Sequence, residues 1–237
     1  MESEAVEIPL WQQAWAWFEN NKRAALWGAA VLALAALVIA FLLYRHNETE
    51  VAASEAFSNV ALAGANGANR SERPEAYLKV AAAYPSSRAG ARALLFAASA
   101  LFVEAKYPEA KAQFERFTRE HGDSPLIGEA LLGIASCLDA QGKTAEATTA
   151  YRNLVDNHPS DLVAPQARFA LGRLYEAQNK PEQARNMFEE VERSNPYGAL
   201  GSEAGMRLEE LKLKYPNLAI PAAPGLTNAF PLQPPKR

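Results

Sequence analysis

The chain has 237 residues, with 24 lysines and arginines against 27 aspartates and glutamates, for a formal net charge of −3. This length suits one folded unit with appendages, and the near-neutral charge balance without a basic patch argues against nucleic acid as a partner. The only cysteine, Cys137, excludes an internal disulfide. Three dispersed histidines give no spacing typical of a metal site, so we expect no metal and no cofactor.

Residues 1–23 are predicted to form a cytoplasmic or interfacial segment. Apolar and aromatic residues recur there at helical spacing, including Trp11, Trp15 and Phe18. Tryptophan favours the headgroup level of a bilayer, where its apolar ring and its polar N–H are both satisfied. The simpler interpretation is an interfacial anchor, and the alternative is a docking helix for a cytoplasmic partner.

Residues 24–44 carry no charge over 21 positions and predict a transmembrane helix. Such a helix rises about 31 Å, which matches the hydrocarbon core of a bilayer, whereas a buried core helix of this length would keep a polar face. The run is longer than the apolar part of a secretory signal, so we expect an uncleaved anchor. Lys22 and Arg23 precede the span and only Arg45 follows it closely, which favours a cytoplasmic N-terminus. In a bacterium the anchor would lie in the inner membrane and the rest of the chain in the periplasm.

The rest of the chain repeats itself every 37 residues. The stretches GKTAEATTAYRNLVDNHPS (142–160) and NKPEQARNMFEEVERSNPY (179–197) are nearly alike. The same step aligns small or apolar residues in four sets: Ala93, Ala130, Ala167 and Ala204; Ala110, Ala147 and Ala184; Phe114, Tyr151 and Phe188; Phe117, Leu154 and Val191. Self-similarity at this period is typical of a stacked array. The spacing of the apolar residues predicts that each unit consists of two helices with a short turn between them. Pro108 and Pro181 fall in the first turn of the second helix, where a missing N–H costs little.

These residues resemble the tetratricopeptide repeat. The unit that matches best carries the small and apolar residues of that motif at the family's spacing: Leu171, Gly172, Tyr175, Ala184, Phe188, Val191 and Pro196. The resemblance implies an all-α fold, with one N-terminal transmembrane helix followed by an α-solenoid over residues 48–215. Residues 48–65 and 71–84 are expected to form a degenerate first pair, and residues 199–215 a capping helix. The proline-rich stretch 216–237 is expected to be a tail, either a spacer or a ligand segment with Phe230 as its anchor.

In the tetratricopeptide architecture the first helices of the units line a concave groove, which we expect to bind a partner. The repeat register predicts these inward positions: Arg92, Leu95, Ser99, Phe102, Glu129, Leu132, Ser136, Asp139, Gln166, Phe169, Arg173 and Glu176. Leu95, Leu132, Phe169 and Met206 form an apolar row at one repeat position. This row either contacts a partner or packs against neighbouring helices, and both interpretations stay open. Its apolar character argues against a clamp for a terminal carboxylate and favours apolar or extended-chain contacts.

No motif indicates catalysis, so we expect no catalytic residue and no enzyme activity. The stretch GANGAN is not followed by the Lys-Ser/Thr pair of a phosphate-binding loop. His121 and His158 occupy equivalent positions near predicted helix ends, where a partial positive charge is mildly favourable, and neither has a partner nearby in the sequence that would make it a metal ligand. Cys137 falls in register with Ala100 and Leu174, which predicts a small buried side chain.

The overall layout resembles the single-pass ancillary subunit of the bacterial Sec translocon, most closely over residues 15–62. That resemblance implies an accessory subunit that meets exported chains or periplasmic chaperones. The repeats beyond residue 85 also resemble envelope proteins that organise cell-wall or outer-membrane assembly, which implies a folded partner instead. Both interpretations predict a scaffold for protein–protein interaction that binds neither nucleic acid nor a small-molecule substrate.

Overall fold

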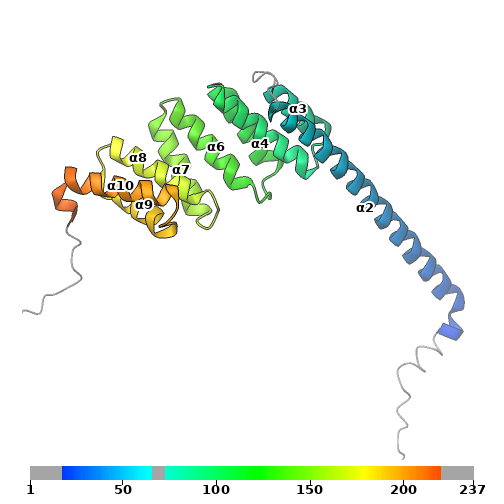
Figure 1. Cartoon of the computed structure of the whole chain (residues 1–237). Helices are drawn as coiled ribbons and strands as arrows, with labels where there is room; N and C mark the ends of the chain where they lie inside the picture. The colour runs from blue at the N-terminus through cyan, green and yellow to red at the C-terminus, as the bar shows by residue number, and fades with distance from the viewer. Residues whose placement is uncertain (1–17, 66–72, 220–237) are drawn as a thin grey trace, which may run out of the picture.

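The computed structural model describes residues 18–65 and 73–219 of the chain, and within these ranges every regular element is helical. The elements are α2 (Lys22–Ala65), α3 (Arg73–Ala83), α4 (Arg88–Val103), α5 (Tyr107–Glu120), α6 (Ile127–Ala140), α7 (Thr144–Asn157), α8 (Ala164–Ala177), α9 (Pro181–Ser194), α10 (Ala199–Lys214) and the 3-10 helix η2 (Pro216–Ala219). The all-α solenoid is therefore confirmed (Figure 1). Of the segment 1–23 only its last residues, and of the predicted tail only its first, fall within the described part of the chain.

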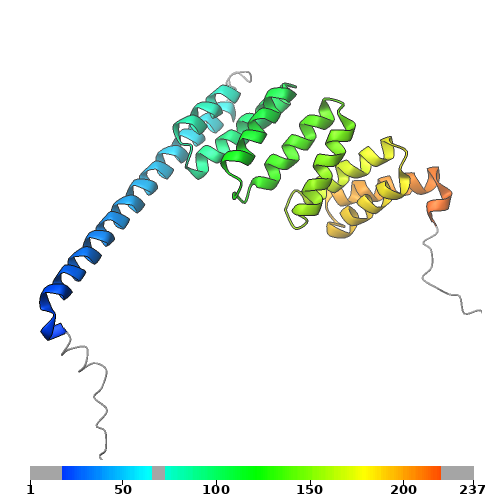
Figure 2. The ribbon, with the colours of Figure 1, turned by 180° about the vertical axis from the view of Figure 1, so that it is seen from behind.

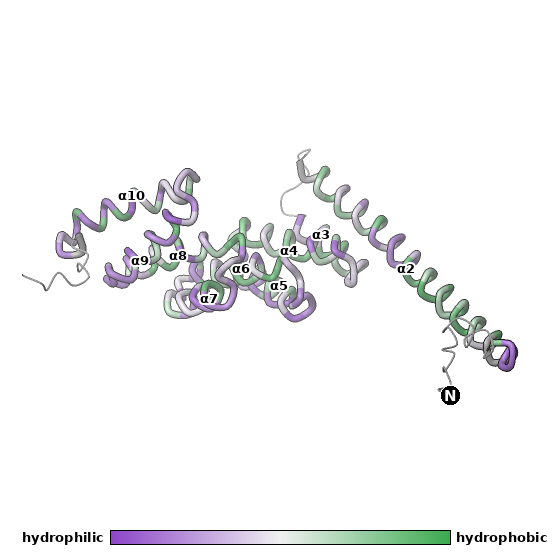
Figure 3. The backbone as a smooth tube through the Cα atoms, turned by 90° about the horizontal axis from the view of Figure 1, so that it is seen from below, coloured by the Kyte–Doolittle hydropathy of each residue, from purple (hydrophilic) through white to green (hydrophobic). Residues whose placement is uncertain are grey.

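The long helix α2 joins two elements that the sequence treats separately. The expected span 24–44 and the expected first helix of the solenoid, 48–65, form one uninterrupted helix from Lys22 to Ala65. Figure 3 shows its hydrophobic N-terminal part extending away from the other helices. By length and composition alone this helix could cross a membrane. Its apolar side chains are exposed, with Trp27 at 75% and Leu32 at 73%, and so large an apolar surface needs a cover other than water.

The second half of α2 and the helices after it stack as antiparallel pairs. Helix α2 contacts α3 and α4, and each later helix contacts the next along the chain, through α10. Both views show the pairs in a row that leads away from the apolar end of α2 (Figures 1 and 2). Helix α10 closes the stack, as expected, and η2 extends it by one short turn where the sequence predicts the start of the tail.

The turns inside the pairs repeat their backbone geometry. Ala105, Gly142 and Asn179 lie 37 residues apart and all have positive φ, at 58°, 72° and 56°. In each case the next amide donates to a carbonyl five residues back, as Lys143 does to Leu138 at 3.0 Å. This arrangement satisfies the free carbonyls at a helix end and leaves one residue left-handed, which favours glycine and tolerates asparagine. The second helix then starts at or next to a proline in α5 and α9, as predicted.

The residues that the 37-residue repeat aligns form the buried core. The aligned alanines, Ala93, Ala130, Ala167, Ala204, Ala110, Ala147 and Ala184, are all fully buried. The aligned rings and aliphatic side chains are at most 5% exposed. Small residues let two helices approach closely, and the larger side chains fill the space between neighbouring pairs. The core is divided into two clusters, one over α3–α6 and one over α6–α10, and Ile134 on α6 packs against both.

Two glycines lie one turn apart on α10, and replacing each by alanine is expected to change the stability of the solenoid in opposite directions. A Cβ on Gly201 would lie 1.9 Å from the backbone oxygen of Asn195, which cannot move without shifting the turn before α10. We expect Gly201→Ala to destabilise the solenoid by about 1–3 kcal/mol. A Cβ on Gly205 meets only the end of the Glu192 side chain at 3.0 Å, so Gly205→Ala is expected to stabilise by up to about 1 kcal/mol through helix propensity. Urea unfolding of both variants in mild detergent checks this pair, and equal effects would contradict the packing of α10.

Candidate functional site

The first helices of the pairs, α4, α6, α8 and α10, are called the A helices here. Helix α4 contacts α6, and α8 contacts α10. All twelve predicted groove residues lie on α4, α6 and α8. We call the exposed and half-buried members of this set the A-helix face: Arg92, Ser99, Phe102, Glu129, Leu132, Ser136, Asp139, Gln166, Arg173 and Glu176.

The predicted apolar row separates into two kinds of position. Leu95 and Phe169 are only 4% and 8% exposed and belong to the two core clusters. The ring of Phe169 lies 5.4 Å from that of Phe188 on α9. Leu132 is half-buried, and Met206 on α10 is 62% exposed. For Leu95 and Phe169 the packing interpretation therefore applies, because neither side chain is open to a partner in this conformation.

Three predicted residues act on Tyr151 of α7, Ser136 through a hydrogen bond and Asp139 and Arg173 through their charges. The hydroxyls of Ser136 and Tyr151 share a hydrogen bond of 3.1 Å. Burial raises the pKa of Tyr151; the Ser136 hydrogen bond opposes the rise, the Asp139 carboxylate adds to it, and the Arg173 guanidinium opposes it. Asp139 on α6 and Arg173 on α8 are thus close enough to act electrostatically on one phenol. We call Ser136, Asp139, Tyr151 and Arg173 the Tyr151 cluster.

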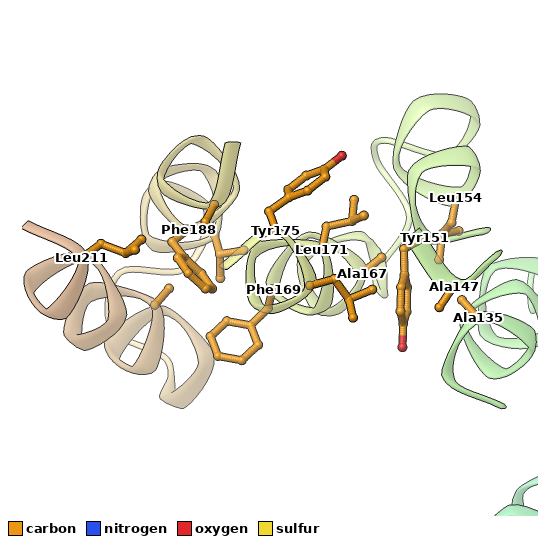
Figure 4. Packing of buried hydrophobic residues seen from close by; sticks show 14 of the residues in the cluster. Ala135, Ala147, Tyr151, Leu154, Ala167, Phe169, Leu171, Tyr175, Phe188 and Leu211 are labelled. Carbon is orange, nitrogen blue, oxygen red and sulfur yellow. The ribbon is translucent and has the colours of Figure 1, made fainter. Parts of the chain in front are cut away.

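The hydroxyl of Tyr151 lies next to the A-helix face, because Ser136, with which it shares a hydrogen bond, belongs to that face. In Figure 4 its hydroxyl and the ring of Phe169 extend to the same side of the helices, whereas Tyr175 extends to the other side. On that other side Arg152 donates to the Tyr175 hydroxyl at 2.7 Å, and Gln178 donates to Thr148 at 3.0 Å. These polar bonds join α7 to α8. The repeat register did predict that a ring lies at position 151, but it gave no sign that its hydroxyl reaches Ser136 on α6.

Three charged side chains of the A-helix face have no ion-pair partner among the described residues. Arg92, Glu129 and Arg173 are exposed, and within the described ranges the structure records no ion pair for any of them. By contrast, Arg168, on the side of α8 that meets α9, pairs with Glu190 at 2.8 Å. Unpaired charges of both signs suit a partner with mixed polar groups, because such charges give specificity and steer association.

The buried cysteine is confirmed as a packing residue. Cys137 is fully buried, and burial raises the pKa of its thiol to about 11, so the thiolate needed for nucleophilic or metal chemistry is scarce at neutral pH. His121 and His158 end helices α5 and α7, as the sequence predicts. In the part of the chain that the structure describes, no three of the usual metal-ligating side chains gather in one place.

Two further contacts were not visible in the sequence. The Glu50 carboxylate on α2 accepts a hydrogen bond from the backbone amide of Arg88 at 2.8 Å, across 38 residues. The rings of Phe57, Tyr77 and Phe96 meet at centroid distances of 5.2–5.6 Å and join α2, α3 and α4. Both contacts fix α4, the first helix of the second pair, to α2. A periodic pattern gives no signal for them, because they occur once, where the array meets the long helix.

Two family models match the chain. One is described as a tetratricopeptide repeat-like domain and matches residues 15–150, which is more than half of the chain. The other is described as a tetratricopeptide repeat and matches residues 166–196. The two matches together cover most of the solenoid and also the long helix α2. A comparison with curated proteins finds no match.

Several solved structures share the fold. A tetratricopeptide repeat protein from Parabacteroides merdae ATCC 43184 matches with a TM-score of 0.55 at 17% identity, over 70% of this chain and 62% of that one. A Podosopora anserina protein with nearly identical TPR-like repeats matches with a TM-score of 0.54 at 14% identity, over 70% and 89% of the two chains. The MamA protein matches with a TM-score of 0.51 at 18% identity, over 73% and 91%. At these identities the likeness concerns the fold alone.

Proposed function

Because the chain belongs to the tetratricopeptide repeat-like family, we propose that it is a membrane-anchored scaffold that binds another protein through its A-helix face. The observation that carries this proposal is the Tyr151 cluster, where Ser136 shares a hydrogen bond of 3.1 Å with the Tyr151 hydroxyl, and where Asp139 and Arg173 from neighbouring repeats act on the pKa of that phenol in opposite directions. A site shared by two repeats exists only in the stacked array, which is the usual way in which such proteins build an extended binding surface.

The anchor in this proposal is the segment 24–44 of α2. Its exposed apolar side chains match a bilayer in length, and the positive charges at Lys22 and Arg23 favour a cytoplasmic N-terminus. The solenoid then lies on the far side of the membrane, which in a bacterium is the periplasm, next to the inner membrane.

We propose as the first candidate an accessory role at the Sec translocon or in the periplasmic chaperone network, with exported chains or the channel itself as partner. This candidate is supported by the layout of one span followed by a repeat domain, and by mixed polar and apolar groups on the A-helix face that suit an extended chain. The alternative is an organiser of cell-wall or outer-membrane assembly that binds a folded partner. Neither candidate requires this chain to carry out chemistry of its own.

Affinity capture of the full-length protein in mild detergent, followed by mass spectrometry, distinguishes the two candidates. Recovery of translocon subunits, periplasmic chaperones or secretory chains supports the first candidate. Recovery of an envelope assembly enzyme supports the alternative. A chain that is purified without any stoichiometric or reproducible protein partner would contradict the scaffold itself.

A further inference from the structure

A cavity of about 660 Å³ lies between α2 and α4, and we call it the α2–α4 cavity. Its lining comes from the start of α4 and from the part of α2 that follows the apolar segment. Because α2 is continuous, the height of each lining residue above the span follows from helix geometry. At 1.5 Å per residue, Asn47 lies about 4–5 Å and Glu50 about 9 Å beyond Tyr44. The headgroup region on one side of a bilayer is about 5–8 Å deep, so the lower end of the cavity lies among lipid headgroups when α2 crosses a membrane.

The charged groups of the α2–α4 cavity lie on different walls. Arg88 and Arg92, one turn apart on α4, supply the positive charges, and Glu50 on α2 supplies the negative charge. Glu50 accepts a hydrogen bond of 2.8 Å from the backbone amide of Arg88, which is neutral, so the carboxylate keeps its charge. Among the described residues none of these three side chains has an ion pair. The cavity therefore presents both signs of charge separately.

The arginines at this end of the solenoid do not outnumber the acids. The arginines Arg45, Arg88 and Arg92 are matched by the carboxylates of Glu48, Glu50, Glu55 and Asp123. Without a positive excess, this surface has no general attraction for anionic lipids. It suits a ligand that carries a positive and a negative group of its own, because each group can then meet its opposite in the cavity.

Helix geometry directs the two arginines toward the membrane end of the cavity. Helix α4 contacts α2 (Figure 1), and the contacts advance in the same direction along both helices. They pair Arg88 with Glu50 at 2.8 Å and the ring of Phe96 with that of Phe57 at 5.2 Å between centroids. Side chains on a helix lean toward its N-terminus. Arg88 and Arg92 therefore lean toward the bilayer, at the level where lipid phosphates lie.

The hydrogen-bonding groups of the cavity distinguish between two zwitterionic headgroups. The α2 wall offers acceptors, namely the Glu50 carboxylate and the Ser54 hydroxyl. The primary ammonium of ethanolamine can donate to them, whereas the trimethylated ammonium of choline has no N–H. Choline is usually held in a cage of aromatic rings, and the described lining has a single phenyl ring, that of Phe57. On the α4 wall the guanidinium groups suit phosphate, because their N–H donors match its oxygens two at a time.

We infer that the α2–α4 cavity binds the headgroup of phosphatidylethanolamine, with the phosphate against Arg88 and Arg92 and the ammonium against Glu50. The inference rests on the proposed function in one respect, that α2 crosses the membrane. The acyl chains then lie along the apolar part of α2 below the cavity, where Leu43 is 64% exposed. A lipid held in this way bridges α2 and α4 at the bilayer surface, so that the solenoid and its A-helix face keep one orientation to the membrane.

Photocrosslinking of the full-length chain in lipid nanodiscs tests this inference. The discs contain equal amounts of phosphatidylethanolamine and phosphatidylcholine with a smaller share of phosphatidylglycerol, and lipid adducts are identified by mass. A photoreactive amino acid replaces Asn47, which lines the cavity, or, as a matched control, Thr49, which is exposed at nearly the same height on another side of α2. We expect the ratio of ethanolamine to choline adducts to be about tenfold higher at position 47 than at position 49, the factor typical of a hydrogen bond to a charged group.

Variants of both walls identify the cause of the enrichment. Glu50→Gln keeps an acceptor for the Arg88 amide but removes the charge, and it is expected to lower the ratio at position 47 to that at position 49. Arg88→Gln with Arg92→Gln should also lower the ratio, because the phosphate loses its donors and the headgroup leaves the cavity. Glu55→Gln changes an exposed acid of α2 outside the lining and should leave the ratio unchanged. Circular dichroism checks that each variant keeps its helices.

Four results would overturn the inference in chains that have entered the discs. The two positions could give the same ratio in otherwise unmodified chains, or position 47 could give no lipid adduct. The enrichment could survive the variant of either wall, or disappear equally with Glu55→Gln. Phosphatidylglycerol could be the lipid enriched at position 47, which would mean that net charge and not a zwitterionic headgroup decides binding. A chain that fails to enter the discs at all would instead refute the anchor in the proposed function, and the inference with it.

Discussion

Truncation of Phe188 to alanine is expected to destabilise the solenoid by about 3–5 kcal/mol, the usual cost of removing a fully buried aromatic ring. Phe188 is 0% exposed, its ring lies 5.4 Å from that of Phe169, and Gly172 approaches it so closely that a Cβ there would lie 2.5 Å from a ring carbon. The ring therefore holds α9 against α8. Because stability in a repeat array depends on contacts between neighbours, α8, α9 and α10 should lose their structure first.

Phe96→Ala is the matched control for this prediction. Phe96 is half-exposed, so the same truncation removes less buried area and is expected to cost clearly less. Urea unfolding of the full chain in mild detergent, followed by circular dichroism, gives both values. Hydrogen exchange then shows whether the loss of protection is confined to residues 164–214. Equal costs for the two variants would contradict the packing of the second core cluster.

Introducing two arginines into the apolar half of α2 is expected to abolish retention of the chain in the membrane fraction. Leu34→Arg with Ile39→Arg introduces charges near the middle of the span, where each costs about 2.5–3.5 kcal/mol. Both residues are exposed, at 64% and 57%, so the solenoid itself does not depend on them. We expect the double variant to leave the membrane fraction, whereas the unmodified chain resists extraction with alkaline carbonate.

A second pair on the same helix controls for the added charge. Val51 and Leu62 are also exposed apolar residues of α2, each at 61%, but they lie beyond the span. Val51→Arg with Leu62→Arg is expected to leave retention unchanged. Retention of the variant with charges at positions 34 and 39, or release of the control, would show that the segment 24–44 is not what holds the chain to a membrane.

Much of the fold could be predicted from the sequence because a repeat array is nearly one-dimensional. One aligned set of residues, such as Ala110, Ala147 and Ala184, gives the buried face of every second helix. The family models then confirm the repeat type that these residues indicate. The register could not show that α2 runs without a break from the span into the first repeat, because the polar residues at 45–50 are compatible with either a turn or a helix.

The exposure of the A-helix residues was harder to predict, because register alone does not give exposure. Leu95 and Met206 occupy the same repeat position, yet Leu95 is 4% exposed and Met206 is 62% exposed. Met206 lies on the last full helix of the stack, where no following pair covers it. Tyr151 shows the reverse case, since its ring is buried as the register predicts while its hydroxyl reaches Ser136. Such details depend on how far apart successive A helices lie, which the spacing of residues along the chain does not specify.

The most direct test of the scaffold is a comparison of partner capture by two double variants of the full-length protein. Asp139→Ala with Arg173→Ala removes both charges of the Tyr151 cluster. Asn153→Ala with Asp156→Ala changes two exposed residues of the second helix α7, outside the A-helix face. If the partner binds across the A-helix face, the first variant should lose it by about tenfold or more, as expected when central interface residues are truncated. The second variant should capture it as well as the unmodified chain. Undiminished capture by the first variant, or an equal loss in both, would contradict the account.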